Sequence, residues 1–254
     1  MNQLSVLIIT YNEEETIAGC IDSVRAIADE IIVLDSFSTD RTVAVAKEKG
    51  AKVIQEKFQG FTAQKNLVIS YSNYRYVFSI DADEVVSEEL LCSIQMEKQK
   101  DFPADAYEMN RLNFFGTRAI KTCGWYPDTK VRLWNKDLAA WKGGLVHEAW
   151  SFLGSKNDGV IEKLNGDLLH YTYQTTEDLV LQSDRFAVLA AKTLKGKTVF
   201  YLLVKMLFSA LFKFIRSYFF KLGFTEGALG FTICYYQSGE VFLKYYYAIK
   251  LKYA

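Results

Sequence analysis

The chain has 254 residues, of which 50% are hydrophobic and 15% aromatic, and its formal net charge is zero. This composition excludes wholesale disorder, and the length fits one large domain or one domain with an appendage. The four cysteines lie far apart without CxxC or CxxH spacing, which argues against a zinc site or a disulfide framework. This cysteine pattern suits a reducing cytosol, and the short apolar run Leu4–Ile9, which ends in polar residues, does not have the form of a signal peptide.

The zero net charge hides an asymmetry between the two parts of the chain. Residues 1–184 contain 19 Lys and Arg against 28 Asp and Glu, whereas residues 185–254 contain 11 against 2. The basic tail is also rich in Phe, Tyr and Leu. Such an asymmetry indicates a polyanionic partner, which is either a nucleic acid or a membrane surface.

Strands and helices are predicted to alternate over the first hundred residues. Short β-branched runs predict the strands, and apolar residues at helical spacing predict the helices. The expected strands are 4–10, 30–34, 52–55 and 75–80, and the expected helices are 14–27, one capped by Ser38 or Thr39 and ending at Gly50, 60–71 and 87–98. This alternation predicts a parallel sheet with helices on both faces.

The pattern changes after about residue 104. Short strands are expected at 106–114, 130–134, 145–150 and 168–173, with long irregular connections between them. They favour an antiparallel or mixed extension of the same sheet. After Thr176 the sequence predicts helices to the end.

The expected strand 75–80 runs directly into Asp81 and Asp83. In open α/β sheets the ligand crevice lies outside the carboxyl ends of the strands, and Mg²⁺ prefers carboxylates together with substrate phosphates. The two acids are therefore placed to hold a metal against a phosphorylated ligand. Taken alone, the same D-x-D pattern also fits a solvated acidic turn.

Two other expected strands end in polar clusters. These are residues 10–14 (TYNEE) and 35–40 (DSFSTD), and Gln64-Lys65-Asn66 follows on a helix. Because neighbouring parallel strands align their carboxyl ends, we expect these clusters to lie close to Asp81 and Asp83.

These motifs, in this order, resemble the family 2 glycosyltransferases of the GT-A fold. The matching segments are SVLIITYNE at 5–13, VLDS at 33–36 followed by Thr39-Asp40, QKN at 64–66, and DAD at 81–83. Segments 124–128 (GWYPD), 131–134 (VRLW) and 146–148 (VHE) resemble the narrower group of lipopolysaccharide core β-glucosyltransferases.

The resemblance implies a Rossmann-like mixed sheet flanked by helices, with a C-terminal amphipathic helical extension. The implied domains are a catalytic domain at 1–175 and an extension at 176–254; residues 1–100 would bind the nucleotide-sugar and 101–175 the acceptor. It also implies Mn²⁺ or Mg²⁺ at Asp83, with Asp81 as a second ligand or a ribose contact. The residues expected to frame the uridine and ribose of a UDP-sugar are Thr10, Asn12, Glu14, Asp35 and Lys65.

An inverting transferase of this family needs a general base for the acceptor hydroxyl, and Glu148 is the candidate. The family commonly has Glu-Asp there, whereas this chain has His147-Glu148. His147 could instead be the base or a metal ligand, with Glu148 orienting it, or the pair could have no role.

The acceptor side is expected among the aromatic and charged residues of the middle segment. Trp125 is favoured for stacking on a sugar, because Gly124 and Pro127 place it in a loop. Asp128 and Arg132 fit either acceptor contacts or a structural ion pair. Trp134 is expected in the core, and His170 is interpreted as a structural histidine.

Residues 198–221 predict an amphipathic helix with a basic stripe of Lys205, Lys213 and Arg216. These charges interrupt every long apolar stretch, so a transmembrane span is not expected. Such a helix suits an anionic membrane interface. The alternative is a helical subdomain that packs on the catalytic domain or on a second protomer; the high apolar content argues against nucleic acid.

The resemblance therefore implies an inverting, metal-dependent hexosyltransferase that uses a UDP-sugar, with UDP-glucose favoured. Its acceptor would be a cell-envelope glycan or lipid-linked molecule such as lipopolysaccharide core, at the cytoplasmic face of a bacterial inner membrane. One alternative is a haloacid-dehalogenase-type phosphatase that uses Asp81 as nucleophile and Asp83 as acid. The other is a non-catalytic membrane-binding module.

Overall fold

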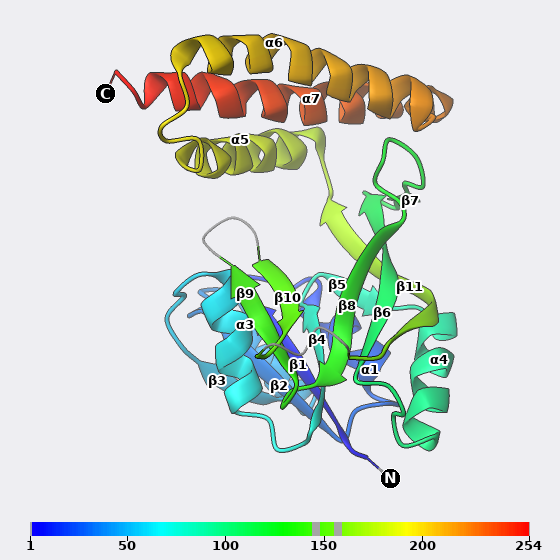
Figure 1. Cartoon of the computed structure of the whole chain (residues 1–254). Coiled ribbons are helices and arrows are strands. Elements are labelled where there is room, and N and C mark those ends of the chain that lie inside the picture. Colours follow the sequence, from blue (N-terminus) through cyan, green and yellow to red (C-terminus); the bar gives the residue numbers. More distant parts are fainter. Residues whose placement is uncertain (1, 144–147, 155–158, 254) are drawn as a thin grey trace. The chain divides into compact units, whose positions relative to one another are not determined.

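The computed structural model describes residues 2–143, 148–154 and 159–253, and for Glu148 it describes the backbone (Figure 1). The described chain forms two compact units. The first comprises residues 1–112 and 128–170, and the second comprises residues 113–127 and 171–254. Residues 113–127, which we expected in the acceptor-binding half, thus group with the C-terminal helices.

The first unit begins with the predicted alternation of strands and helices. In chain order its first elements are β1 (Leu4–Thr10), α1 (Ile17–Val24), β2 (Glu30–Asp35), α2 (Thr42–Glu48), β3 (Lys52–Gln55), α3 (Phe61–Ser70), β4 (Tyr76–Asp81), β5 (Glu84–Val86) and α4 (Glu88–Gln99). The short strand β5 was not predicted. Ser87 caps α4 by accepting a hydrogen bond from the Leu90 backbone N–H, and two glutamates in the first turn favour the helix N-terminus.

The predicted cap of α2 is wrong. Ser38 and Thr39 do not cap this helix, because they bind residues of neighbouring loops instead. The predicted stop is confirmed, since Gly50 follows α2 with a φ of 81°, a conformation that favours glycine.

Long strands and one hairpin follow α4. They are β6 (Ala106–Phe115), β7 (Arg118–Ala119), β8 (Asp128–Asn135), β9 (Ala139–Gly143), β10 (Glu148–Phe152) and β11 (Ile161–Tyr173). The main sheet has the strand order β3-β2-β1-β4-β8-β6-β11-β5, with β7 paired to β6. Strands β1 to β4 are parallel, whereas β8 runs antiparallel to β4, so the predicted mixed sheet is confirmed.

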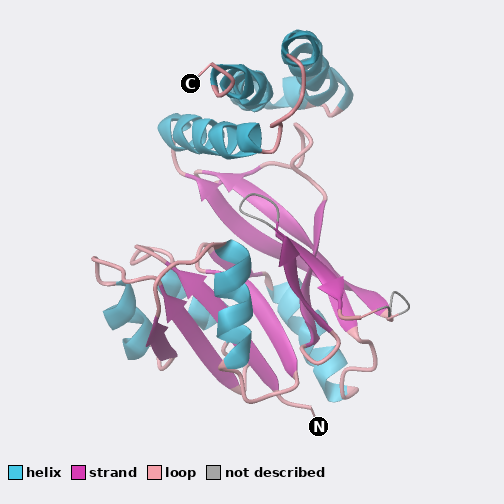
Figure 2. Cartoon of the chain, turned by 60° about the vertical axis from the view of Figure 1, so that its left-hand side comes forward, coloured by secondary structure: helices cyan, strands magenta, loops and turns pink. Residues whose placement is uncertain are grey.

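Helices lie on both faces of the parallel strands (Figure 2), and each face packs into its own apolar layer. Along β1, Val6 and Ile8 pack into a core with α1 and α4, whereas Leu7 between them packs with α3 and the β9–β10 hairpin. This alternation follows from the period of two along a strand. Trp134 is fully buried, as predicted, and lies in the second layer.

The second unit contains the C-terminal helices. They are α5 (Thr176–Lys192), α6 (Val199–Ile215), a π-helical turn η1 (Arg216–Phe220), a 3₁₀ turn η2 (Gly223–Glu226) and α7 (Gly227–Lys250). α5 opens with a capping box in which Thr175 and Asp178 satisfy each other's backbone N–H groups. Within the described residues, no helix is long and apolar enough to cross a membrane.

Candidate active site at the carboxyl ends of the parallel strands

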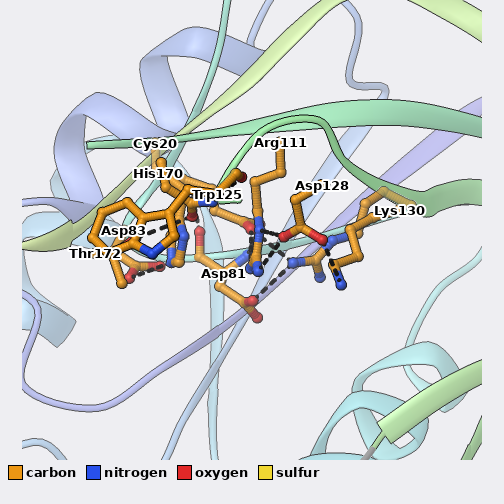
Figure 3. Close-up of polar contacts among 12 residues, drawn as sticks. Cys20, Asp81, Asp83, Arg111, Trp125, Asp128, Lys130, His170 and Thr172 are labelled. Carbon is orange, nitrogen blue, oxygen red and sulfur yellow. Dashed lines mark hydrogen bonds and ion pairs between the residues drawn. The ribbon is translucent and has the colours of Figure 1, made fainter. Parts of the chain in front are cut away.

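Two carboxylates lie where β4 ends, as the sequence predicts. Asp81 is the last residue of β4, and Asp83 lies in the turn that leads to β5 (Figure 3). In the parallel register Ile9 is level with Asp81, and Thr10 is level with Asp35. The polar ends of β1, β2 and β4 therefore meet at one edge of the sheet.

Two buried cations hold the Asp81 carboxylate. Lys65 Nζ lies 3.1 Å from Oδ1, and Arg132 Nη2 lies 3.0 Å from Oδ2. Burial alone would raise the pKa of Asp81, but the charges of Lys65 and Arg132 outweigh it and hold this pKa well below its ordinary value. Asp81 is therefore ionised at neutral pH, and its charge is matched from within the protein.

Arg132 also binds Glu84, a fully buried carboxylate. Arg132 Nη2 lies 2.7 Å from Glu84 Oε1, and Glu84 Oε2 accepts a 2.9 Å hydrogen bond from the Asp81 backbone N–H. The side chains of Arg132 and Glu84 are 3% and 0% exposed. Arg132 thus fixes the turn that carries the acids. Of the two roles that its sequence position allowed, an acceptor contact or a structural ion pair, it has the ion pair.

Replacing Arg132 with methionine is expected to lower the free energy of unfolding by about 3–5 kcal/mol, because it leaves the Glu84 and Asp81 carboxylates buried without this partner. Urea unfolding measures the loss. The matched control is Arg75→Met, since Arg75 pairs with Asp137 at 3.4 Å with both side chains about 60% exposed. The control should lose at most about 1 kcal/mol. Equal losses in the two variants would contradict a structural role for Arg132.

Asp83 faces a histidine. His170 Nε2 lies 3.1 Å from Asp83 Oδ2, and the two side chains are 12% and 29% exposed (Figure 3). β11 pairs antiparallel with β5, which places His170 opposite Glu84 and next to the acidic turn. The residue that we interpreted as a structural histidine therefore lies at the predicted metal acid.

The donor set of Asp83 and His170 fits a divalent cation. A carboxylate oxygen and an imidazole nitrogen both bind Mn²⁺, and further positions can be filled by phosphate oxygens of a substrate. Among the residues that the structure describes, no three His, Cys, Asp or Glu side chains form a ready-made metal cluster. A cation here would share its coordination between the protein and the nucleotide.

Two loops at the ends of β1 and β2 bind each other. The Asn12 backbone N–H donates to Ser38 Oγ at 2.8 Å, and Asn12 Oδ1 accepts from the Thr39 backbone N–H at 2.8 Å. Asn12 has a φ of 54°, a left-handed conformation that asparagine tolerates. The Glu14 carboxylate accepts from the Arg41 backbone N–H at 2.9 Å. Asn12 and Glu14 therefore fix the shape of the loops around the predicted nucleotide site.

Asp35 lies beneath these loops and is 0% exposed. It accepts hydrogen bonds from both the backbone N–H and the hydroxyl of Ser38, and from Gln55 Nε2 at 2.9 Å. Oδ1 accepts one of these bonds and keeps a free acceptor position, but because the side chain is fully buried, a base or ribose could contact it only if neighbouring groups moved. Lys65 is likewise 1% exposed, with its ammonium 4.9 Å from the ring centre of Trp141.

Near these strand ends, buried oxygens of two neutral side chains lack a hydrogen-bond partner in the described structure. They are Thr10 Oγ1 at the end of β1 and Gln64 Oε1 on α3. Unpaired buried polar atoms are rare and costly, and a ligand is one way to satisfy them. The Gln64 amide nitrogen binds Ser36 Oγ at 3.2 Å, which places this side chain beside the loop after β2.

The residues predicted for the acceptor lie in different places. Asp128 forms two hydrogen bonds with Arg111, at 2.7 and 2.9 Å, and an ion pair with Lys130 at 2.9 Å. Burial opposes ionisation of Asp128, but these cations outweigh it and lower its pKa. Trp125 belongs to the second unit, where its ring lies 5.5 Å from that of Tyr173.

The two candidate bases are described in part or not at all. Glu148 is the first residue of β10, where its backbone pairs with Gly143. The structure therefore has a strand at Glu148–Phe152, which overlaps the strand predicted at 145–150. The Glu148 side chain and His147 lie outside the described residues.

Sequence reasoning missed the roles of His170, Glu84 and Arg111. Glu84 directly follows the D-x-D motif, so its position was a usable signal once β4 was assigned. Arg111 reaches Asp128 and also lies 3.4 Å from Glu84. No local sequence pattern marks His170 as a site residue. It lies near Asp83 because β11 pairs with β5, and these two strands are far apart in the sequence.

Known protein sequences match this chain over most of its length. A family model described as Glycosyl transferase family 2 matches residues 5–154. Uncharacterized glycosyltransferases of Rickettsia typhi and Rickettsia prowazekii are 32% and 34% identical to it, and each alignment covers 91% of this chain and 82% of the relative. Among solved structures, glucosyl-3-phosphoglycerate synthase of Mycobacterium tuberculosis aligns with a TM-score of 0.37 at 24% identity, over 46% of this chain and 45% of that one.

Proposed function

Because the chain belongs to glycosyl transferase family 2, we propose that this nucleotide-sugar glycosyltransferase moves a hexose from a UDP-sugar to a cell-envelope acceptor. Its fold is the predicted GT-A fold, a mixed sheet flanked by helices. The observation that carries the proposal is the pair of Asp83 and His170, 3.1 Å apart beside the polar ends of β1 and β2. Family membership also decides against the phosphatase and against a non-catalytic membrane module.

The donor site would use the edge where β1, β2 and β4 end. Thr10 and Gln64 offer buried oxygens without partners, and the loops fixed by Asn12 and Glu14 surround them. Asp35 keeps the loop after β2 in place through Ser38. Asp81, neutralised by Lys65 and Arg132, would accept from a ribose hydroxyl and keep the acidic turn in position.

Asp83 and His170 would hold Mn²⁺ or Mg²⁺ against the diphosphate. The bound cation would neutralise the charge that develops on the departing diphosphate. On the protein side, Asp83 supplies the anionic ligand, and Arg132 and Glu84 keep its turn fixed. We favour UDP-glucose as donor and a lipopolysaccharide core or another lipid-linked glycan as acceptor, on the resemblance of residues 124–148 alone.

Glu148 remains the proposed base in an inverting transfer. Glu148→Gln keeps the shape and removes the basicity, so turnover should fall roughly 10²–10⁴-fold while UDP affinity stays near wild type. Steady-state kinetics and calorimetric titration with UDP measure the two quantities. His147→Ala is the companion variant. An active Glu148→Gln together with an inactive His147→Ala would move the assignment to His147.

We further propose that α6 docks on the cytoplasmic face of a bacterial inner membrane. The side of α6 that packs inward contains the buried Leu202 and the half-buried Lys213, whereas the exposed side is apolar. The exposed large hydrophobic side chains of α6 are Phe200, Tyr201, Leu203, Val204, Leu207, Phe208, Leu211, Phe212 and Ile215. Lys205 and Arg216 are exposed on the same helix and its end, so an anionic lipid surface offers complementary charge.

The donor is best identified with a panel of nucleotide-sugars. Each is added with and without Mn²⁺, and the melting temperature of the protein is recorded. A donor at 100 times its dissociation constant stabilises the fold by about 2.7 kcal/mol. We expect stabilisation by UDP-sugars in the presence of Mn²⁺. Stabilisation by GDP- or nucleoside-monophosphate-sugars in place of UDP-sugars would overturn the proposed donor.

A further inference from the structure

The second unit contains a cavity of about 300 Å³ that lies within the helical part of the chain. Helices α5, α6 and α7 each contribute polar residues to its wall, and two aromatic side chains also line it. The lining residues that matter here are Trp125, Tyr173, Ser183, Lys213, Gln237 and Glu240.

Local structure explains why these side chains converge. Gln237 and Glu240 are three residues apart on α7 and therefore share one face of that helix. Lys213 comes from α6, and Ser183, which is 5% exposed, comes from α5. The Trp125 loop is anchored where Asn113 Nδ2 donates to the Trp125 carbonyl oxygen at 3.2 Å.

The polar groups of this cavity are poorly satisfied by the protein itself. Gln237 Oε1 is buried without a hydrogen-bond partner in the described structure. Burial lowers the pKa of Lys213 and raises the pKa of Glu240, although their opposite charges partly offset both shifts. Among the described residues, neither side chain forms an ion pair within 4 Å. Keeping such groups buried costs stability, which a bound ligand would recover.

The composition of the wall selects the ligand. Trp125 and Tyr173 pack on each other with ring centres 5.5 Å apart, and both stay partly exposed, so their outer faces offer an aromatic surface for the C–H face of a sugar. The carboxylate of Glu240 beside Lys213 argues against a phosphate, and the four polar side chains of the wall argue against an alkyl chain. The volume is at the lower end of the roughly 300–1,000 Å³ of ligand pockets, so it suits one small ring.

We propose that this cavity binds a neutral pyranose of the acceptor glycan. Gln237 and Glu240 accept from its hydroxyls, Lys213 donates to one, and Trp125 packs on its face. The assignment of the sugar to the acceptor rests on the proposed transferase function. The cavity would make the helical unit a specificity element for the glycan that is extended.

The test uses the 254-residue chain without nucleotide or metal and a panel of methyl pyranosides of glucose, galactose, mannose and N-acetylglucosamine. Saturation-transfer NMR and calorimetric titration measure binding, with inorganic phosphate as a second probe. We expect at least one glycoside to bind, and Gln237→Met and Glu240→Met to weaken it at least tenfold. Lys192→Met, an exposed change on α5, is the matched control and should leave the affinity unchanged.

Thermal melting distinguishes a ligand role from a structural one. Gln237→Met removes a buried oxygen without a partner, and Glu240→Met removes a half-buried carboxylate, so their melting temperatures should be equal to or above that of the wild type. A lower melting temperature together with unchanged glycoside affinity would overturn the proposal. So would tighter binding of phosphate than of every glycoside, or the absence of glycoside binding.

A parallel titration of the wild type with UDP and Mn²⁺ separates the two proposals. UDP binding without glycoside binding would reject the cavity and keep the donor site. Glycoside binding that the two variants abolish, without UDP binding, would reject the proposed donor and keep the cavity.

Discussion

Asp83→Asn is expected to reduce sugar transfer by roughly 10³-fold or more, which corresponds to about 4 kcal/mol of activation free energy. The amide keeps the size of the side chain but removes the charge that would face the cation. UDP binding should also lose its dependence on Mn²⁺. Initial rates with a radiolabelled UDP-sugar and calorimetric titration with UDP, each with Mn²⁺ or with EDTA, measure the two effects.

The matched control for Asp83 is Asp137→Asn, because the Asp137 side chain is 61% exposed and forms a surface pair with Arg75. The control should keep wild-type rates. His170→Ala should weaken Mn²⁺-dependent UDP binding in the same direction as Asp83→Asn, since both side chains are proposed ligands. Full activity of Asp83→Asn, or of the wild type in EDTA, would refute the metal role.

Replacing Phe200, Phe208 and Phe212 with serine should release the protein from membranes, with a loss of at least about 100-fold in vesicle partitioning. These rings are 78%, 68% and 66% exposed, so the fold should not depend on them. Burying a phenylalanine is worth about 1.5–3 kcal/mol, and an interface recovers part of this for each ring. Sedimentation with vesicles that contain anionic lipid measures the partitioning.

The control for the α6 variant is the double change of Phe58 and Phe61 to serine, since these rings are 52% and 53% exposed in the first unit. It should leave vesicle binding unchanged. Wild-type binding should weaken as salt rises, because attraction to surface charge is screened within about 8 Å at physiological ionic strength. A wild-type dimer that ignores vesicles and that the triple change dissociates would show that this face binds a second protomer.

The sequence predicted the parallel half of the fold well, because that half depends on local patterns. Lys52–Gln55 was predicted to the residue, and the acids at 81 and 83 were placed at the end of their strand. The antiparallel half was predicted in type but not in pairing. The pairing of β11 with β5 joins Leu168–His170 to Glu84–Val86, and no short-range pattern encodes such a contact.

The same difference between local patterns and long-range contacts determines which site residues could be predicted from the sequence. Asp81 and Asp83 could be found from the strand that precedes them, whereas Arg132 and His170 reach them from β8 and β11. The predicted cap of α2 failed for a related reason, since Ser38 and Thr39 each had a partner in another loop. The basic stripe of 198–221 is also divided, because Lys213 turns into the cavity while Lys205 and Arg216 stay exposed.

The pairing of Asp81 and Glu84 with Lys65 and Arg132 bears on how long a cation would remain bound between turnovers. Of the three acids at 81, 83 and 84, Asp81 and Glu84 are paired with buried cations, so Asp83 remains to face a cation, with His170 beside it. We therefore expect the ion to exchange quickly once the diphosphate has left. Its residence time would then follow that of the nucleotide product, and the enzyme would draw a fresh ion from solution in each cycle.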